Sequence, residues 1–190
     1  MTPNKLVFFF LACLLMFTFS DDNLVAGDSD KVKLNLYYES LCPGCQEFIV
    51  DGLVKVFDSD LHTITDLTLV PFGNAKISDN LTVACQHGEE ECKLNAIEAC
   101  AIKTWPNPLI LAYAKQTLSL KPKHKYVPWV TVNGKPLYEK VNDFVAQVCK
   151  AYKGKSALPK VCNSSALSKS RESNNVFKLQ VSYADEAINY

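Results

Sequence analysis

The sequence predicts an α/β fold in which a βαβ part comes first and a ββα part comes last. Three observations lead to this prediction. A β-rich segment, Val32 to Tyr38, runs almost directly into Cys42-Pro43-Gly44-Cys45. The residues after Cys45 repeat their apolar positions at helical spacing. Near the other end of the chain, a β-branched segment leads into Asn133-Gly134, which is a strong hairpin signal.

The composition is that of one globular domain with short appendages. The 190 residues are 48% hydrophobic, which is enough for a continuous core. Lys plus Arg number 20, as do Asp plus Glu, and neither sign is concentrated in one segment. We therefore expect no strong field that would attract nucleic acid or an anionic membrane, so partners must be recognised by shape and chemistry.

The N-terminal segment has the pattern of a signal peptide, which we expect to cover residues 1–26. Lys5 precedes an apolar run from Leu6 to Phe19, and this run is shorter than the roughly 20 residues that a membrane-spanning helix needs. A retained membrane anchor is the alternative. Asn80-Leu81-Thr82 and Asn163-Ser164-Ser165 fit N-glycosylation acceptors. We expect a glycoprotein of the secretory pathway, in a lysosome or vacuole or outside the cell, with no membrane attachment in its mature form.

The folded domain is expected to span residues 30–162. Its first strand is Val32 to Tyr38, and a second strand is expected over Leu67 to Phe72. Between the two strands, the helix that starts at Cys45 should bury its apolar positions on one face. These positions are Phe48, Ile49, Leu53, Val56 and Phe57.

Residues 75–125 are expected to form a helical insertion between the two parts of the fold. Helical patterns run from Glu89 to Lys103 and from Leu109 to Leu118. Trp105-Pro106-Asn107-Pro108 breaks the pattern between them.

The ββα part follows this insertion. Val127 to Val132 is a β-branched strand, Asn133-Gly134 turns the chain, and Pro136 to Tyr138 begins the return strand. A closing helix is marked by Phe144, Val145 and Val148. Residues 163–190 are polar and have no sustained period, so we expect a disordered tail.

Eight cysteines indicate an oxidising compartment. Cys13 lies in the signal segment, so its removal leaves seven of the eight. Cys149 and Cys162 flank a short loop and are expected to form a structural disulfide.

Three further cysteines leave their pairing open. If residues 89–100 form one helix, Cys92 and Cys100 lie about 12 Å apart along its axis, which is too far for a disulfide. Cys85 precedes this helix and could pair with either of them. The odd cysteine that remains suggests a disulfide-linked homodimer.

Cys42 and Cys45 have the spacing of a redox-active pair. Only a thiolate attacks a disulfide, and the amides and dipole of a helix N-terminus favour a thiolate, so the pKa of Cys42 should be lowered. We expect Cys42 to be exposed at the tip as the nucleophile, and Cys45, one turn further in, to be the resolving cysteine. The cycle needs an external small thiol as reductant and no metal or organic cofactor.

Val127-Pro128-Trp129 precedes a strand late in the chain. A proline at such a place is often cis, although trans is the commoner state of such bonds. If Pro128 packs against the CxxC turn, the backbone of Val127 can hold an extended substrate chain beside the reactive sulfur.

Other interpretations of the cysteine pair remain. An isolated CxxC also occurs in structural disulfides and zinc sites. The other cysteines offer no second close pair and the three histidines are scattered, so we expect no metal. The pair could also act as a disulfide oxidase or isomerase, and the chain could be a non-catalytic secreted binding module stapled by disulfides.

A longer motif makes the prediction specific. The segment that begins with Cys85-Gln86-His87-Gly88 and continues with Glu91-Cys92, Asn95 and Cys100 contains eight fixed positions. It matches the signature Cys-Gln-His-Gly-x-x-Glu-Cys-x-x-Asn-x-x-x-x-Cys of the gamma-interferon-inducible lysosomal thiol reductase family. The resemblance runs from about Val32 to Cys162 and includes residues 70–75, 126–130 and 133–134.

The resemblance implies a thioredoxin-like fold with a helical insertion. It also implies reduction of disulfide bonds in unfolded protein substrates, in an acidic compartment of the endocytic or secretory pathway. The family's active cysteines correspond to Cys42 and Cys45 alone. We expect His87 to act structurally, as a polar cap near the helix that begins at Glu89.

Overall fold

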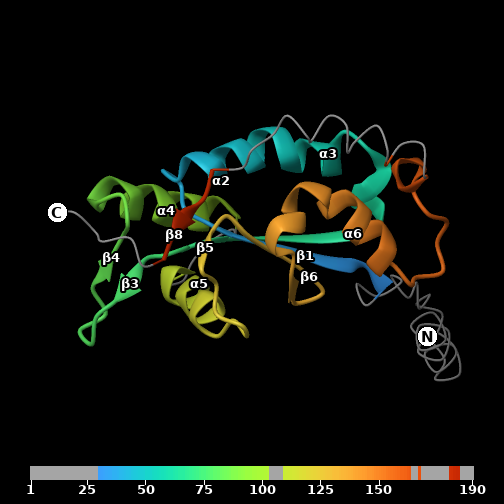
Figure 1. The fold of residues 1–190 in the computed structure, drawn as a ribbon. Coiled ribbons are helices and arrows are strands. Elements are labelled where there is room, and N and C mark those ends of the chain that lie inside the picture. The colour runs from blue at the N-terminus through green and yellow to red at the C-terminus, as the bar shows by residue number, and fades with distance from the viewer. Residues whose placement is uncertain (1–29, 103–108, 164–166, 168–179, 185–190) are drawn as a thin grey trace, which may run out of the picture.

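The structure is a computed structural model that describes residues 30–102, 109–163, 167 and 180–184 (Figure 1). The predicted signal peptide at 1–26 and the predicted break at 105–108 lie outside the described residues. Within the described ranges, no helix is long and apolar enough to cross a membrane.

A four-stranded mixed sheet forms the centre of the fold, in the order β2-β1-β6-β7. Its strands are β1 (Val32–Tyr38), β2 (Thr65–Pro71), β6 (Trp129–Val132) and β7 (Lys135–Pro136). β1 pairs with β2 in parallel and with β6 in antiparallel orientation, so Leu34 lies between Leu67 and Val132. The parallel pair needs a crossover connection, and the helix that begins at the Cys-Pro-Gly-Cys turn supplies it.

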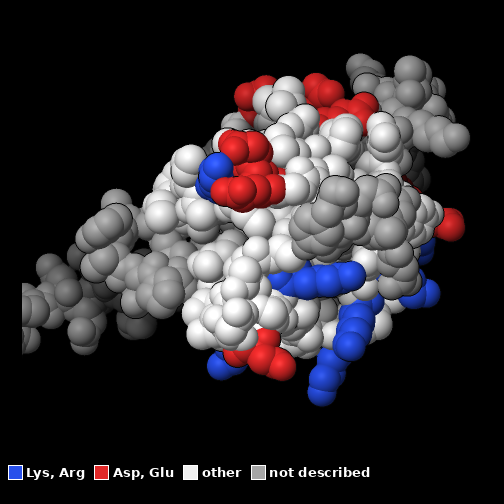
Figure 2. All heavy atoms as spheres, turned by 90° about the vertical axis from the view of Figure 1, so that its left-hand side faces the viewer, with Lys and Arg blue, Asp and Glu red and all other residues white. Residues whose placement is uncertain are grey.

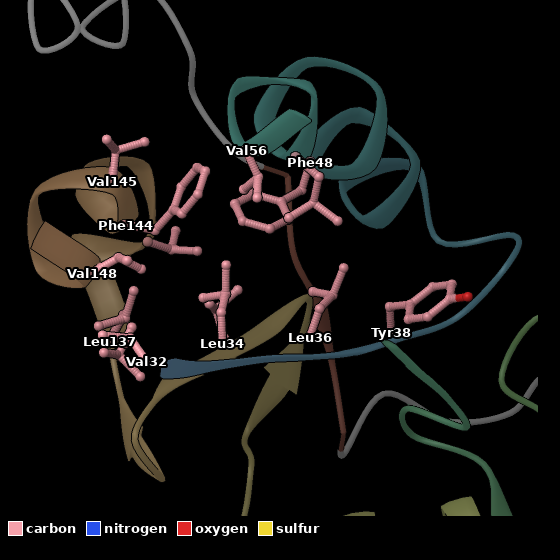
Figure 3. Packing of buried hydrophobic residues seen from close by; sticks show 14 of the residues in the cluster. Val32, Leu34, Leu36, Tyr38, Phe48, Val56, Leu137, Phe144, Val145 and Val148 are labelled. Atoms are coloured by element: carbon pink, nitrogen blue, oxygen red, sulfur yellow. The ribbon is translucent and has the colours of Figure 1, made fainter. Parts of the chain in front are cut away.

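The crossover helix and α6 cover one face of this sheet. The helix comprises α2 (Pro43–Glu47), a wider π-type segment (Phe48–Leu53) and α3 (Val54–Phe57), and α6 spans Phe144–Ala151. Figure 3 shows Leu34 and Leu36 of β1 pointing toward the helices that carry Phe48 and Phe144. The rings of Phe48 and Phe144 meet edge to face with their centroids 5.5 Å apart. This core fixes the helix whose N-terminus carries Cys42.

The π-type segment changes which residues of the crossover helix are buried. Phe48, Leu53 and Val56 are buried as predicted, but Phe57 is 63% exposed. A π-type segment has more residues per turn than an α-helix and therefore rotates the residues that follow it. The apolar face predicted from regular α-helical spacing ends before Phe57 for this reason.

Two helices and a hairpin lie between β2 and β5 in the chain. They are β3 (Lys76–Ile77), β4 (Val83–Ala84), α4 (Glu89–Ile102) and α5 (Leu109–Leu118). Both helices contact β2, and Figure 1 shows α5 on the face of the sheet opposite α3. A second buried cluster, which includes Tyr37, Phe72 and Tyr113, fills the space between them.

The strand predicted over Val127 to Val132 is divided at Pro128. β6 continues in the main sheet, whereas β5 (Tyr126–Val127) pairs with β8 (Ser182–Tyr183). The sequence predicts a disordered tail over 163–190, and residues 180–184 depart from this prediction. They are held by backbone pairing that the composition of the tail does not reveal.

Short 3₁₀ helices join the larger elements at Asp60–Thr63, Tyr138–Asp143 and Lys160–Cys162. The return strand predicted from Pro136 to Tyr138 is shorter and earlier, at Lys135–Pro136. Tyr138 cannot continue this strand because it has a positive φ of 50° and begins a 3₁₀ helix.

Cys149 and Cys162 form the disulfide that the sequence predicts, with their Cα atoms 5.5 Å apart. Cys85 forms a disulfide with Cys92, a pairing that the sequence left open. Cys100 is an exposed free thiol on α4.

Candidate active site

Cys42 and Cys45 lie at the start of the crossover helix and are joined by a disulfide, with their Cα atoms 5.2 Å apart. Cys42 is the N-cap residue and Pro43 occupies the first turn, where its missing N–H costs no helical hydrogen bond. The backbone N–H of Cys45 donates to Sγ of Cys42 over 3.2 Å. The free amides of the helix start are therefore directed at the sulfur of Cys42, where they favour negative charge.

The segment that precedes β6 in the chain, β5, also approaches the sulfur of Cys42. Sγ of Cys42 lies 3.8 Å from the carbonyl oxygen of Val127. The peptide bond between Val127 and Pro128 is cis. The structure thus brings together the two segments, 85 residues apart in the chain, that the sequence singled out.

Neither cysteine of the pair is exposed. Both Cys42 and Cys45 have 0% of their surface accessible, although the sequence predicts an exposed Cys42 at the tip of the turn. The described part of the C-terminal tail lies against this turn, because the carbonyl of Gln180 sits where a side chain on Gly44 would otherwise project.

The segment just before Cys42 is held by residues of the signature motif. Asn95 on α4 accepts a hydrogen bond of 2.9 Å from the backbone N–H of Ser40. The hydroxyl of Ser40 donates to the carbonyl of Glu91 at 3.4 Å, and the Gln46 amide donates to the carbonyl of Ser40 at 2.7 Å. These contacts anchor the chain between β1 and the cysteine pair to α4.

Glu39 is a buried acid three residues before Cys42. Its Oε1 accepts a 2.6 Å hydrogen bond from the backbone N–H of Asn74. Desolvation, followed by repulsion from Glu91, raises the pKa of Glu39 to about 8. Gly73, with φ of +52°, makes room for it, because a Cβ at this position would overlap the Glu39 side chain. Glu39 is therefore mostly a neutral acid at pH 7 and below.

His87 and Glu91 complete a cluster with Glu39. Nδ1 of His87 lies 2.5 Å from Oε2 of Glu91 and 3.5 Å from Oε2 of Glu39. The backbone N–H of His87 also donates to Oε1 of Glu91 at 3.2 Å, so these two residues close the first turn of α4. This arrangement agrees with the structural role predicted for His87.

This cluster also contains the donor atoms that could hold a metal ion. The ligand-type atoms of Glu39, His87 and Glu91 lie within 4.8 Å of one another. In this structure His87 and Glu91 are in direct contact with each other.

Comparisons with known proteins agree with the geometry. The family model "Gamma interferon inducible lysosomal thiol reductase (GILT)" matches residues 33–120. The "Gamma-interferon-responsive lysosomal thiol protein" of Arabidopsis thaliana is 58% identical over 98% of this chain and 97% of its own length. The chain belongs to this family. Proteins named "Gamma-interferon-inducible lysosomal thiol reductase" are 36% identical in Carassius auratus, over 71% of this chain and 73% of its own length, and 32% identical in Mus musculus, over 73% of this chain and 74% of its own length.

Membership of the GILT family gives the mixed α/β chain a thioredoxin-like fold and makes it a thiol–disulfide oxidoreductase. The GILT signature segment has structural roles in this chain. Its Cys85–Cys92 disulfide joins the end of β4 to α4, and its Asn95 and Glu91 hold the segment before Cys42.

Four polar residues around the site were not predicted as site residues from the sequence: Glu39, Asn74, Gln86 and Asn95. Gln86 and Asn95 are fixed positions of the signature, so their importance could have been read from it. Asn74 lies in the segment 70–75 that the resemblance includes, whereas Glu39 carries no such signal, because a lone acid after a strand is common on protein surfaces.

Proposed function

We propose that this protein reduces disulfide bonds of protein substrates, with Cys42 as the nucleophile and Cys45 as the resolving cysteine. One observation carries the assignment. Cys42, not Cys45, has its sulfur at the helix start, where it accepts the N–H of Cys45 and also approaches the carbonyl of Val127. A thiolate at that position is stabilised by the helix and faces the edge strand that can hold a substrate.

The first step forms a mixed disulfide. The thiolate of Cys42 attacks one sulfur of the substrate disulfide, a bond forms between the two sulfurs, and the second substrate sulfur leaves as a thiolate that takes up a proton. Val127 and Pro128 position the substrate chain beside Cys42 during this attack.

The second step releases the substrate. Cys45 loses its proton and attacks the sulfur of Cys42, which breaks the mixed disulfide and expels the second substrate thiolate. Two electrons have then passed from the cysteine pair to the substrate, and the protein holds the Cys42–Cys45 disulfide. A small external thiol reduces this bridge for the next turnover, so the protein needs no organic cofactor.

The setting we propose is an acidic compartment of the secretory or endocytic pathway. The names of the relatives in Arabidopsis thaliana, Carassius auratus and Mus musculus all contain the word lysosomal. Buried Glu39, with its pKa raised to about 8, is accommodated at lower free energy when protonated, so acidic pH suits this fold.

Two surface features fit the same route. The glycosylation acceptors Asn80 and Asn163 are both exposed, as glycan attachment requires. Cys100 is an exposed thiol, and we propose it as the link of a disulfide-bonded homodimer. Non-reducing electrophoresis of the wild type against Cys100→Ser tests this pairing, because only the wild type should give a dimer band.

We propose that the protein accepts a broad set of substrate chains, and the charge distribution of the face that carries α4 supports this. Figure 2 shows acidic side chains gathered toward the top of this face and Lys side chains lower down, so neither sign covers it. A substrate is then selected by an accessible disulfide in an extended chain rather than by its net charge.

The test is reduction of a denatured, disulfide-bonded protein from acidic to neutral pH, with a small thiol as electron donor. Wild type should reduce the substrate, Cys42→Ser should not, and Cys45→Ser should accumulate mixed disulfides. Cys100→Ser is the matched control, since it removes an exposed thiol outside the pair and should stay active.

If Cys42→Ser reduces the substrate as fast as the wild type, the pair is structural and the proposal is wrong. Direction is tested separately by equilibrating the Cys42–Cys45 pair with glutathione, because an oxidase would hold its reduced form as the more stable state.

A further inference from the structure

Residues 180–184 of the C-terminal tail lie on the strand next to the reactive cysteine. β8 pairs antiparallel with β5, with Val127 opposite Ser182 and Tyr126 opposite Tyr183. The backbone N–H of Ala184 also donates to the carbonyl of Lys125 at 2.9 Å. Figure 1 shows β8 lying between β5 and α2, the two elements that bound the site. This is strand addition to a free edge, a common way for a protein to bind an extended peptide.

Two side-chain amides bind the backbone of the tail. Asn74 donates to the carbonyl of Ser182 at 3.1 Å, and Gln86 donates to the carbonyl of Tyr183 at 2.9 Å. Asn74 also donates to Oε1 of Gln86 at 2.6 Å, which orients the Gln86 amide so that its N–H₂ group faces the tail. Both contacts are to main-chain atoms, so any extended chain could make them.

The tail then runs over the cysteine turn. The carbonyl of Gln180 occupies the space into which a Cβ on Gly44 would project, and Cys42 is fully buried. A buried sulfur cannot attack a disulfide in another chain, so the tail must leave before the proposed reaction begins. After Cys162 the sequence contains no cysteine, which means that the tail can occupy the site without reacting.

We propose that residues 180–184 occupy the binding site of the substrate polypeptide, and that Asn74 and Gln86 are substrate-binding residues that hold its main chain. The inference rests on the proposed reductase function and adds to it the site, the form of the substrate and a competitor. The partner is an extended polypeptide that places a disulfide over Cys42. Because the tail belongs to the same chain, it competes at high effective concentration, and the apparent affinity for substrate falls in proportion to the fraction of molecules whose site the tail leaves open.

The first experiment compares the full chain with a chain that ends at Leu167, since the side chain of Leu167 packs on the core and residues 168–190 do not belong to the predicted domain. The substrates are an extended peptide containing a disulfide and oxidised glutathione. Removing the tail should lower KM for the peptide by about tenfold or more, with a smaller change for oxidised glutathione. Adding a synthetic peptide of residues 176–190 to the shortened chain should raise its KM again toward that of the full chain.

A second readout does not depend on turnover. In the reduced proteins, iodoacetamide should alkylate Cys42 faster in the shortened chain, and a fluorescent form of the 176–190 peptide should bind the shortened chain but not the full one. If neither chain reduces any disulfide, the proposed function fails while these measurements still decide the tail site. Equal alkylation rates and equal peptide KM values in the two chains would overturn the inference.

The roles of Asn74 and Gln86 are tested in the shortened chain, where no tail competes. Gln86→Glu keeps the oxygen that accepts from Asn74 but loses the donor to the bound main chain. It should raise KM for the peptide several-fold and leave the rate with oxidised glutathione unchanged. Gln147→Glu on α6 is the matched control and should change neither. A peptide KM in Gln86→Glu equal to that of the parent would show that Gln86 does not bind substrate.

Discussion

Two cysteine-containing segments of this protein meet at one site but do different work. Cys42-Pro43-Gly44-Cys45 places a sulfur at a helix start, and all that its chemistry needs is a thiolate and a second thiol in reach. The segment from Cys85 to Asn95 also contains a disulfide, yet its polar residues bind backbone: Asn95 holds Ser40 and Gln86 holds the tail. Similar residue types therefore serve reaction in one segment and positioning in the other.

The difference lies in what each sulfur pair touches. The Cys42–Cys45 pair borders the edge strand at Val127, where a substrate chain can be bound. The Cys85–Cys92 pair joins β4 to α4 and packs with the second core cluster. In the proposed mechanism only the pair that borders the edge strand exchanges with another chain, whereas the Cys85–Cys92 pair holds two segments of its own chain together.

The largest expected effect separates the two pairs directly. Replacing Cys42 by Ser should lower reductase activity by about a thousandfold or more, because the nucleophile is lost. Replacing Cys85 and Cys92 together by Ser should keep activity within about tenfold and lower the free energy of unfolding by about 2–3 kcal/mol, the value for a short disulfide loop. Turnover assays and urea denaturation measure the two quantities. Loss of activity in a folded Cys85→Ser/Cys92→Ser protein would give the second pair a chemical role.

Substitution of Glu39 should change how the free energy of unfolding depends on pH between about 4.5 and 8. Its pKa is raised from 4.5 to about 8, so the folded protein keeps a proton that the unfolded chain releases. The stabilisation is complete below about pH 4.5 and is lost as pH rises to about 8, by at most about 1.4 kcal/mol per pH unit. Glu39→Gln should remove this slope, measured by urea denaturation at several pH values. His87 and Glu91 face Glu39 and are kept in both proteins, so parallel curves would show that Glu39 does not titrate in this range.

A smaller loss is expected when the anchor of the reactive turn is removed. Asn95→Ala leaves the buried N–H of Ser40 without its acceptor, which should cost about 1–3 kcal/mol of unfolding free energy. Exposed Lys115→Ala on α5 is the control and should change the stability little. Because the turn would be less firmly held, the variant should also reduce substrate more slowly. Stability equal to that of the control would mean that water replaces Asn95 as the acceptor.

The smallest effect is expected on the outer side of the same helix. Lys93 pairs with Glu89 at 3.2 Å and Glu90 at 2.8 Å, and all three side chains are exposed. Such surface pairs contribute little because water and salt screen them. Lys93→Ala should change neither stability nor activity measurably in denaturation and turnover assays. A clear loss would show that the helix surface, and not only its buried side, supports the site.

General sequence rules predicted the first segment well and the second one poorly. The bounds of β1 and α5, the cysteine pair at a helix start and the Cys149–Cys162 disulfide all follow from local patterns. The family signature pointed to residues 85–100, but it did not say what Gln86 or Asn95 touches. Both bind main-chain atoms of segments that are distant in the chain, and no local pattern encodes such contacts.

The same limit explains the prediction that failed at the site. An exposed Cys42 is predicted from its place at the start of a helix, but Cys42 is buried, and residues 180–184 pair with the neighbouring strand although their polar neighbours give no strand pattern. Phe57 was predicted to be buried but is exposed, because the π-type segment before it shifts the buried face of the helix, and the sequence pattern does not show this segment.

The most direct test of the central claim is to trap the mixed disulfide. Cys45→Ser in the shortened chain is reduced, mixed with a disulfide-containing peptide, quenched with acid and digested for mass spectrometry. The account predicts that the peptide is linked to Cys42 and that Cys42→Ser traps none. Peptide linked through Cys100, or no linkage in either variant, would contradict the assignment of Cys42 as the nucleophile.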